Sequence, residues 1–549
     1  MKTKLLQYLK TPALFLALSC ATTLNAQTAP AWVQFAGPAE YANYDTREVC
    51  VGVDTAGNVY TAASAYDTVN NLDKSVLVKY NSAGVQQWIK FYDNANLPNN
   101  EKSIVALLVD KAGNSYLCGY GKNSAVPGTS IDYLVMKYDN TGFQQWVKYW
   151  DGGNSDRDYI TCASFDAAGN IVVGGYVEGG ANGNDMGVVK YGISGTQMWS
   201  YVYNNSVANG EDRPLSIASD ASNNIFLTGS SYGTNARDMI TIKLNSSGAN
   251  QWTKLVTHAS SGNDERGYGI TTDAAGNCYA TGAVGDWITI KYDPSGTVLW
   301  TNHYTANGLN SDNVKKVMLD KHNGVILAGD AFVSGGGHFS DLVVFKLDNA
   351  TGQQMWSVSI DNGGIDKFGD AVLDTSGTVY IGGDFEGPLG GDMSAMIISS
   401  GGGVMWNTTY SNPSRAAGKD NPYQVAVDRN RNFYMAGLAE RRGSGSDDAV
   451  DIITLKYSTL VTGIKENTLN HINLNIYPNP AKDNLTVSFT EQNMLGSTIS
   501  ITNMVGEVVI KETLNTLNQQ IKLDQLSEGI YLVRVTNGTS VATGKLIIK

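Results

Sequence analysis

The stretch that decides the fold is residues 105–149, VALLVDKAGNSYLCGYGKNSAVPGTSIDYLVMKYDNTGFQQWVKY. It contains an apolar run, an Asp-x-x-Gly-Asn turn, a second run that ends in glycine, a polar loop, a run that ends in Lys-Tyr, and a Gly turn before a Trp strand. Short apolar runs bounded by such turn residues are typical of antiparallel strands. The unit is therefore predicted to contain four strands, at residues 105–110, 115–119, 133–138 and 145–149.

The same unit recurs along the chain, and each copy carries a tryptophan at the same place in its last strand. The tryptophans are spaced 48–58 residues apart, at Trp32, Trp88, Trp146, Trp199, Trp252, Trp300, Trp356 and Trp406. A period of this size indicates a repeat architecture. Four-stranded units arranged around an axis are the blades of a β-propeller. The sequence therefore predicts an all-β, eight-bladed β-propeller over residues 27–458.

The first turn of each copy begins with an aspartate: Asp54, Asp110, Asp166, Asp220, Asp273, Asp320, Asp374 and Asp428. Three residues later most copies have Gly, and two have Asn, residues that tolerate the left-handed backbone of a tight hairpin. Arg431 is the exception, and it predicts a strained or altered turn in the last copy.

The two ends of the repeat complement each other. The first copy of the Trp strand, residues 31–35, has no Gly turn before it, and the last unit, which ends at Tyr457, has no Trp strand after it. We therefore expect residues 31–35 to supply the outermost strand of the eighth blade. The ring would then be closed by an N-terminal strand.

The composition fits this architecture and argues against some classes of binding partner. Of 549 residues, 60 are glycine and only 16% are charged, as in proteins built from short strands and tight turns. The net charge of −12 repels phosphate backbones, so no nucleic acid partner is expected. No transmembrane segment is expected in the mature chain.

Residues 1–26 are predicted to be a signal peptide. Lys2 and Lys4 form the basic start, an apolar stretch follows, and small residues near Ala26 offer a cleavage point. Acylation at Cys20 is the alternative, although Leu18 fits a lipoprotein site poorly. Export would permit disulfides, but the remaining cysteines show no pairing pattern and are expected to be buried free thiols: Cys50, Cys118, Cys162 and Cys278.

Across roughly residues 28–458 this pattern resembles the secreted bacterial β-propeller repeat family (SBBP-type). The segment from Asp348 to Trp356, DNATGQQMW, also resembles the tryptophan-docking motif of quinoprotein propellers. In that family the motif joins neighbouring blades, so this resemblance implies a structural role and no cofactor. A quinone-dependent oxidoreductase is the least favoured of the possible functions, because no vicinal cysteine pair is present.

After a predicted linker at residues 459–470, residues 471–549 show short alternating strands typical of a small β-sandwich. Four motifs characterise this region: residues 476–480 (IYPNP), 503–506 (NMVG), 526–531 (LSEGIY) and 544–549 (GKLIIK). Together they resemble the type A C-terminal sorting domain of the type IX secretion system of Bacteroidetes. The resemblance implies export across the outer membrane by that machinery, removal of the domain, and release or attachment at the cell surface.

No local catalytic or metal-binding motif is present: there is no HExxH, no G-x-S-x-G and no P-loop. No catalytic residue, metal or cofactor is therefore predicted. The one ordered set of polar residues is acidic and lies before the first strand of seven of the eight blades, at Asp45, Asp158, Asp212, Glu265, Asp312, Asp366 and Asp420. A second set begins the third strands, and it includes Asp132 and Asp185.

Since first and third strands run in the same direction, both acidic sets are expected at the mouth of the central channel. They could bind a cation or cleave glycosides with paired carboxylates. Alternatively, each carboxylate could accept hydrogen bonds from nearby backbone N–H groups. The acids recur in nearly every unit, whereas a functional site usually departs from the repeat, so the structural role is favoured. By the same test, Trp150 and Trp287 are expected in the core.

The loops between second and third strands do not follow the repeat. Loops on a rigid scaffold are where residues that determine ligand specificity are expected. We expect ligand-binding residues there, at His338, Phe339, Arg441 and Arg442. The sequence favours a secreted or cell-surface binding and adhesion scaffold that recognises glycan or protein through these loops. The alternative is a polysaccharide-degrading hydrolase or lyase that uses the acids of the channel mouth.

Overall fold

The computed structural model describes residues 29–36, 49–67, 72–92, 103–123, 130–153, 157–179, 183–205, 210–233, 236–257, 265–284, 286–304, 313–322, 324–331, 341–360, 366–387, 390–412, 420–440, 450–458, 470–471, 474–489, 494–503, 508–536 and 540–549. Within these ranges the long regular elements are all β-strands. The contacts divide the chain into two units, one covering residues 25–459 and one containing residues 460–549.

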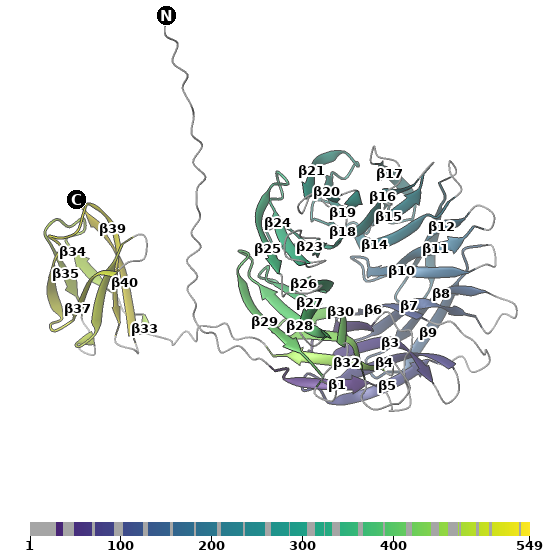
Figure 1. The fold of residues 1–549 in the computed structure, drawn as a ribbon, viewed down its shortest axis with the longest axis horizontal. Helices are drawn as coiled ribbons and strands as arrows, with labels where there is room; N and C mark the ends of the chain where they lie inside the picture. The colour runs from purple at the N-terminus through teal and green to yellow at the C-terminus, as the bar shows by residue number, and fades with distance from the viewer. Residues whose placement is uncertain are drawn as a thin grey trace, which may run out of the picture. The chain divides into compact units, whose positions relative to one another are not determined.

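The larger unit is an eight-bladed β-propeller (Figure 1). Blade 1 comprises β2 (Val49–Val53), β3 (Val59–Asp67), β4 (Leu72–Tyr80) and β5 (Gln86–Tyr92), and blade 2 comprises β6 (Ser103–Val109), β7 (Ser115–Lys122), β8 (Ile131–Tyr138) and β9 (Gln144–Trp150). Blade 3 comprises β10 (Asp158–Phe165), β11 (Ile171–Glu178), β12 (Asn184–Tyr191) and β13 (Gln197–Tyr203), and blade 4 comprises β14 (Arg213–Ser219), β15 (Ile225–Tyr232), β16 (Arg237–Leu244) and β17 (Asn250–Val256).

The second half of the ring repeats this order. Blade 5 comprises β18 (Arg266–Thr272), β19 (Cys278–Val284), β20 (Asp286–Tyr292) and β21 (Val298–Tyr304), and blade 6 comprises β22 (Asn313–Leu319), β23 (Val325–Ala331), β24 (Asp341–Leu347) and β25 (Gln354–Ile360). Blade 7 comprises β26 (Asp366–Leu373), β27 (Val379–Gly387), β28 (Gly390–Ile398) and β29 (Val404–Tyr410), and blade 8 comprises β30 (Asp420–Val427), β31 (Phe433–Glu440), β32 (Val450–Tyr457) and β1 (Trp32–Ala36).

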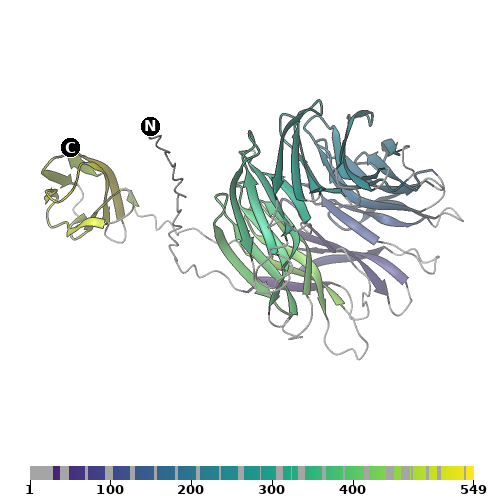
Figure 2. The ribbon, with the colours of Figure 1, turned by 45° about the horizontal axis from the view of Figure 1, so that its top comes forward.

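Neighbouring blades meet through their innermost strands, from β2 against β6 round to β26 against β30 and β30 against β2. Apolar side chains of adjacent sheets form the core between blades, and Trp287 and Trp150 are buried in it as expected. The twist of each sheet is visible in Figure 2. We call the side of the ring where the innermost strands begin the mouth face, and the side with the Asp-x-x-Gly turns the turn face.

The predicted closure of the ring is confirmed. Strand β1 pairs antiparallel with β32, and Trp32 lies opposite Lys456. This register matches that of the other outer strands, in which Trp88 lies opposite Lys79 and Trp146 opposite Lys137. The backbone N–H of Ala31 also donates to the Lys456 carbonyl oxygen at 2.7 Å. The N-terminal strand therefore completes blade 8.

The tryptophans join each blade to the next. The Trp32 indole N–H donates to the carbonyl oxygen of Ser82 in blade 1 at 3.3 Å, and Trp300 donates to Asn349 in blade 6 at 2.8 Å. The turn glycine of the receiving blade lies against the same ring, because a Cβ added at Gly84 would stand 2.7 Å from Trp32. The resemblance to a tryptophan-docking motif therefore describes the contact correctly, and it extends to seven blade boundaries.

The turn of blade 8 keeps its hairpin geometry despite Arg431. The Arg431 backbone N–H donates to Asp428 at 2.9 Å, as Gly57 does to Asp54 at 3.0 Å. Arg431 adopts a φ of 63°, which is costly for a residue with a Cβ. Its guanidinium reaches blade 7, where Nε lies 3.0 Å from a carboxylate oxygen of Asp374. The predicted strain is present, but the turn is not altered.

The second unit is a small β-sandwich. One sheet contains β33 (Asn470–His471), β40 (Ser540–Ile548), β39 (Gly529–Thr536), β36 (Thr498–Thr502) and β37 (Val508–Thr513), and the other contains β34 (Asn475–Tyr477), β35 (Asn484–Ser488) and β38 (Asn518–Lys522). Leu485 and Ile521 from one sheet pack with Ile499 and Val533 from the other. Asn479, from the motif at residues 476–480, accepts the Ile547 N–H at 2.9 Å and donates to the Lys545 carbonyl oxygen at 2.5 Å.

Candidate functional site

The structure places five of the seven predicted mouth acids at the start of an innermost strand: Asp158, Asp212, Glu265, Asp366 and Asp420. Each of the five is buried, with at most 3% of its surface exposed. Asp45 and Asp312 lie outside the described residues.

Two of these carboxylates tie together parts of two blades. Asp158 accepts the backbone N–H of Gly152, which follows the outer strand of blade 2, at 2.6 Å, and that of Glu178 in its own blade at 3.2 Å. Asp212 accepts the N–H groups of Asn205 and Tyr232 in the same way, at 2.7 and 3.3 Å. This recurring arrangement supports a structural role for the acids.

Burial changes the ionisation of the acids at one boundary in particular. It raises the pKa of Asp158 to about 7, with a smaller contribution from Asp132 and Asp151, against the opposing effect of the two N–H donors. Burial also raises the pKa of Asp132, which lies at the start of the third strand of blade 2, to about 6. Within the described ranges, no group of three or more His, Cys, Asp or Glu side chains could hold a metal ion.

A different set of mouth residues departs from the repeat. Three tyrosine rings follow one another across blades 2 and 3. Tyr120 contacts Tyr159 edge-on with ring centroids 4.7 Å apart, and Tyr159 stacks on Tyr176 at 5.1 Å. The guanidinium carbon of Arg213, in blade 4, lies 4.5 Å from the centre of the Tyr176 ring. We call Tyr120, Tyr159, Tyr176 and Arg213 the mouth strip.

Ion pairs hold the cationic end of the mouth strip in place. Glu211 pairs with Arg213, and its second oxygen lies 2.6 Å from a guanidinium nitrogen of Arg237. The Arg213 and Arg237 side chains keep 34% and 25% of their surface exposed. Burial raises the pKa of Tyr176 to about 12, and the neighbouring Arg213 partly offsets this, so the phenol stays neutral.

The mouth strip could have been found from the sequence. Tyr120 and Tyr176 each follow the glycine that ends a second strand, where the other units have Ser64, Ser230, Ala283, Asp330, Asp384 and Leu438. Tyr159 follows a mouth acid, where other units have Arg213, Arg266, Asn313, Lys367 and Asn421. These positions vary in chemistry while their neighbours repeat. They lie at strand ends, outside the loops and strand interiors in which binding residues were predicted.

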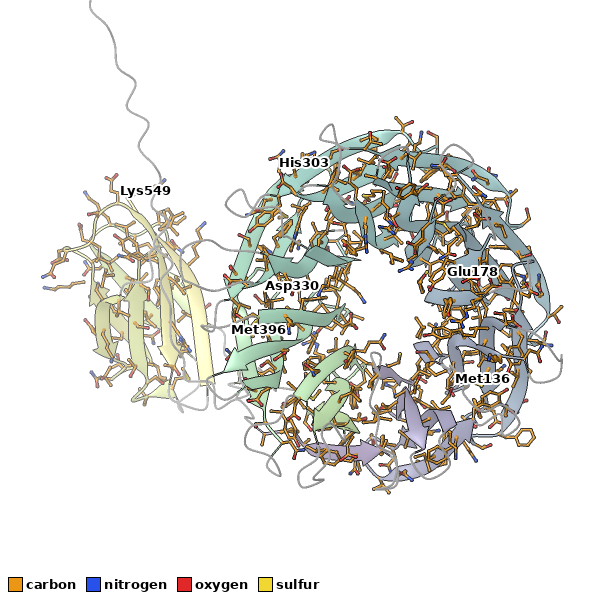
Figure 3. The ribbon with its side chains drawn as sticks, turned by 45° about the vertical axis from the view of Figure 1, so that its right-hand side comes forward. Met136, Glu178, His303, Asp330, Met396 and Lys549 are labelled. Atoms are coloured by element: carbon orange, nitrogen blue, oxygen red, sulfur yellow. The ribbon has the colours of Figure 1, made fainter. Side chains whose placement is uncertain are left out.

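Blades 6 and 7, in the opposite part of the ring, carry ion pairs on their first and second strands. Lys315 lies 2.6 Å from Asp330, and Lys316 of blade 6 lies 2.8 Å from Asp370 of blade 7. Figure 3 shows Asp330 and Glu178 on the inner side of the ring, on opposite sides, and His303 on its outer side. The mouth is therefore chemically asymmetric, aromatic and guanidinium-rich near blades 2–4 and ion-paired near blades 6 and 7.

The predicted ligand-binding residues His338, Phe339, Arg441 and Arg442 lie outside the described residues. The four remaining cysteines are buried free thiols, as expected. Among the residues described, no helix is long and apolar enough to span a membrane.

Residues 475–549 match the family described as the secretion system C-terminal sorting domain. The chain is thus a β-propeller protein with a type IX sorting domain, which indicates export to the cell surface or the medium. No curated protein matches the chain.

Several solved structures are similar over most of the chain at low identity. The Chaetomium thermophilum Sqt1 structure is 11% identical, with 76% of this chain and 97% of that chain covered and a TM-score of 0.48. The Dos1 propeller is 9% identical, with 77% and 94% covered and a TM-score of 0.44. PorZ, described as a surface component of the type IX secretion system of Porphyromonas gingivalis, is 12% identical, with 91% and 75% covered and a TM-score of 0.34.

Proposed function

We propose that this exported propeller is a binding and adhesion scaffold that recognises a glycan or a protein through the mouth face of the ring. The observation that carries the proposal is the mouth strip, a run of three tyrosines and an arginine that the repeat does not require. Tyr and Arg are the residues that most often dominate binding energy at protein interfaces. Aromatic rings offer apolar area and keep a polar edge for hydrogen bonds.

The setting of the mouth strip suits recognition. Its rings stand on paired strands and pack against one another, so little conformational entropy is lost when a ligand binds. Its one guanidinium group, on the partly exposed Arg213 side chain, could donate to hydroxyl or carboxylate oxygens. In this proposal the loops that carry His338, Phe339, Arg441 and Arg442 would frame the same face and add specificity.

Binding of the full chain to intact bacterial cells and to immobilised polysaccharides tests this function. The variant Tyr120→Ser/Tyr176→Ser gives each position the residue found at the same place in blades 1 and 4, so folding should be retained. We expect binding to fall by about tenfold or more, because two ring contacts are lost. The control Asn421→Ala changes the position of blade 8 that corresponds to Tyr159. Unchanged binding by the folded double variant would contradict the proposal.

A second candidate function, polysaccharide hydrolysis or elimination, is favoured by one observation. Asp158 and Asp132 have pKa values raised to about 7 and about 6, and carboxyl groups of this kind can serve as general acids near neutral pH. Loss of viscosity in polysaccharide solutions with the wild type, and none with Asp158→Asn, would support it. Equal loss with both proteins would show that Asp158 is not the acid.

A further inference from the structure

A second feature that departs from the repeat lies on the turn face, at the outer rim between blades 1 and 2. It is an open groove of about 680 Å³. One wall is the outer strand β5, and the other is the hairpin between β8 and β9. The lining residues are Lys90, Phe91, Tyr92, Tyr138, Thr141, Gly142, Phe143 and Gln144. We call this the rim groove.

Phe143 distinguishes the rim groove from the other blade boundaries. Its side chain is 69% exposed, although a phenyl ring is usually buried. The corresponding residues of the other turns are Val85, Thr196, Ala249, Thr297, Gln353 and Gly403, none of them aromatic. The ring therefore has no role that the repeat requires.

The backbone beneath Phe143 is held firmly. Asp139 accepts the backbone N–H groups of Thr141 and Phe143 at 2.9 and 3.0 Å. Gly142 packs on the Trp88 ring of blade 1, because a Cβ there would stand 2.8 Å from the indole. The exposed phenyl ring is thus presented from a fixed turn rather than from a long loop.

Polar groups surround the ring, and the Asp139 carboxylate beneath it is already bonded to groups of its own turn. Lys90 is the one charged residue of the lining, and its side-chain stem runs beside Gly142, since an added Cβ would meet its Cε at 2.7 Å. The Gln144 amide donates to the Tyr138 hydroxyl at 3.2 Å and keeps its carbonyl oxygen as an acceptor. The Thr141 hydroxyl donates to Asp139 at 2.6 Å, which leaves its lone pairs for a ligand donor.

We propose that the rim groove is a binding site for an acidic glycan chain, one that carries uronic acid residues. The apolar face of a sugar ring stacks on Phe143, a carboxylate pairs with Lys90, and sugar hydroxyls bond to Thr141 and Gln144. Concave sites that combine aromatic side chains with a few polar groups are typical of small-ligand recognition. An open groove lets a polymer continue at both ends. This site is separate from the mouth strip and does not depend on the function proposed for it.

Isothermal titration of the full chain with trigalacturonate tests the rim groove. We expect Phe143→Ala to weaken binding by about tenfold or more, because the stacked ring contributes through both area and contact geometry. Val85→Ala, at the same position of the blade 1 turn, is the matched control and should bind like the wild type. Tyr120→Ser/Tyr176→Ser should also bind trigalacturonate normally, so failure of one site is distinguishable from failure of the other.

Lys90→Met keeps the aliphatic stem and removes the charge. We expect this variant to bind trigalacturonate no better than the wild type binds the methyl-esterified, neutral trisaccharide. Polyglutamate offers the same carboxylates without a sugar ring and should not displace the ligand. Unchanged affinity in Phe143→Ala, or displacement by polyglutamate at equal carboxylate concentration, would overturn the proposal.

Discussion

At the residue scale, glycine and tryptophan act as a pair across each blade boundary. The turn glycines have φ near 80°, and at seven boundaries the glycine also lies against the indole ring of the preceding blade. Gly84 illustrates both demands, with a φ of 83° and Trp32 beside it. The repeated glycine is thus required by backbone conformation and by close approach, not by the turn alone.

Two alanine substitutions separate the effect of the backbone conformation from the effect of the close contact with the indole ring. Gly84→Ala and Gly169→Ala both place a Cβ on a backbone with a φ of 83°, which costs about 1–2 kcal/mol. No atom lies within 4 Å of a Cβ at Gly169, whereas the Trp32 ring stands 2.7 Å away at Gly84. We expect the larger fall in thermal midpoint for Gly84→Ala. Equal falls in the two variants would show that the glycine–indole contact adds nothing.

The buried acids give the second prediction at this scale. The pKa of Asp158 is about 7 in the folded chain, above its ordinary value of 3.8, so the folded state holds a proton that the unfolded state has released between those values. This contribution to stability is complete below about pH 4 and is lost as the pH rises through 7. Asp158→Asn removes it. The midpoint of the variant should therefore rise relative to wild type between pH 4.5 and 7.5, and a constant difference would contradict the assignment.

At the scale of the elements, the boundary between blades 7 and 8 differs from the other seven. Blade 8 has no hairpin between its third and outermost strands, because β32 and β1 are joined only by pairing. In the part of the chain described, the Trp406 N–H is buried without an acceptor. Its cross-strand partner is Ile397, where the other seven sheets have lysine. In five of those sheets the lysine donates to the turn carbonyl that also accepts the Trp N–H.

Removing the indole N–H should therefore cost different amounts at two similar sites. Trp300 and Trp406 are 9% and 4% exposed, but only Trp300 has a carbonyl acceptor, at 2.8 Å. We expect Trp300→Phe to lower the free energy of unfolding by about 1 kcal/mol more than Trp406→Phe. Denaturant titration of both variants measures this difference. A larger loss for Trp406→Phe would mean that its N–H has an acceptor in solution.

The strands and their closure could be predicted from the sequence because each strand is encoded by local alternation and each turn by its own residues. Trp32 and Tyr457 also revealed which strand was missing from which blade. Aligning the units would single out Tyr120 and Tyr159 as unusual residues, but not their contact with each other, since Tyr120, Tyr159 and Arg213 belong to three blades and meet only once adjacent sheets are in register. The exposure of Phe143 likewise depends on how blade 1 packs beside the turn of blade 2. The local sequence pattern does not determine that packing.

At the scale of the whole molecule, the propeller is a ring whose last blade is assembled from both ends of the repeat. Trp32 contributes to two blades, since its strand pairs with β32 and its indole docks on Ser82 and Gly84 of blade 1. A closed ring keeps the mouth strip and the rim groove at fixed positions on opposite faces. The sorting domain is a separate unit with its own core. The export signal and the proposed binding surfaces thus lie in different units of the chain.

Trp32→Ala tests how far the ring depends on its closing strand. The substitution removes the ring contacts with Tyr80 and Tyr434 and the hydrogen bond to blade 1. Since Trp to Ala changes at packed sites cost about 3–5 kcal/mol and Trp32 is only half-buried, we expect a loss near the lower end of that range. The thermal midpoint should fall, and an unchanged midpoint would contradict a closing role for this residue.

Amide hydrogen exchange of the full chain, followed by mass spectrometry, tests the closure most directly. Strand β5 is the matched reference, because it is an outermost strand with the same Trp-to-Lys register. We predict that the segment Trp32–Ala36 is protected as strongly as Gln86–Tyr92, and that Trp32→Ala exposes both Trp32–Ala36 and Val450–Tyr457. Exchange of Trp32–Ala36 at the rate of an unstructured peptide, while the other outer strands stay protected, would contradict an eight-bladed ring closed by its N-terminal strand.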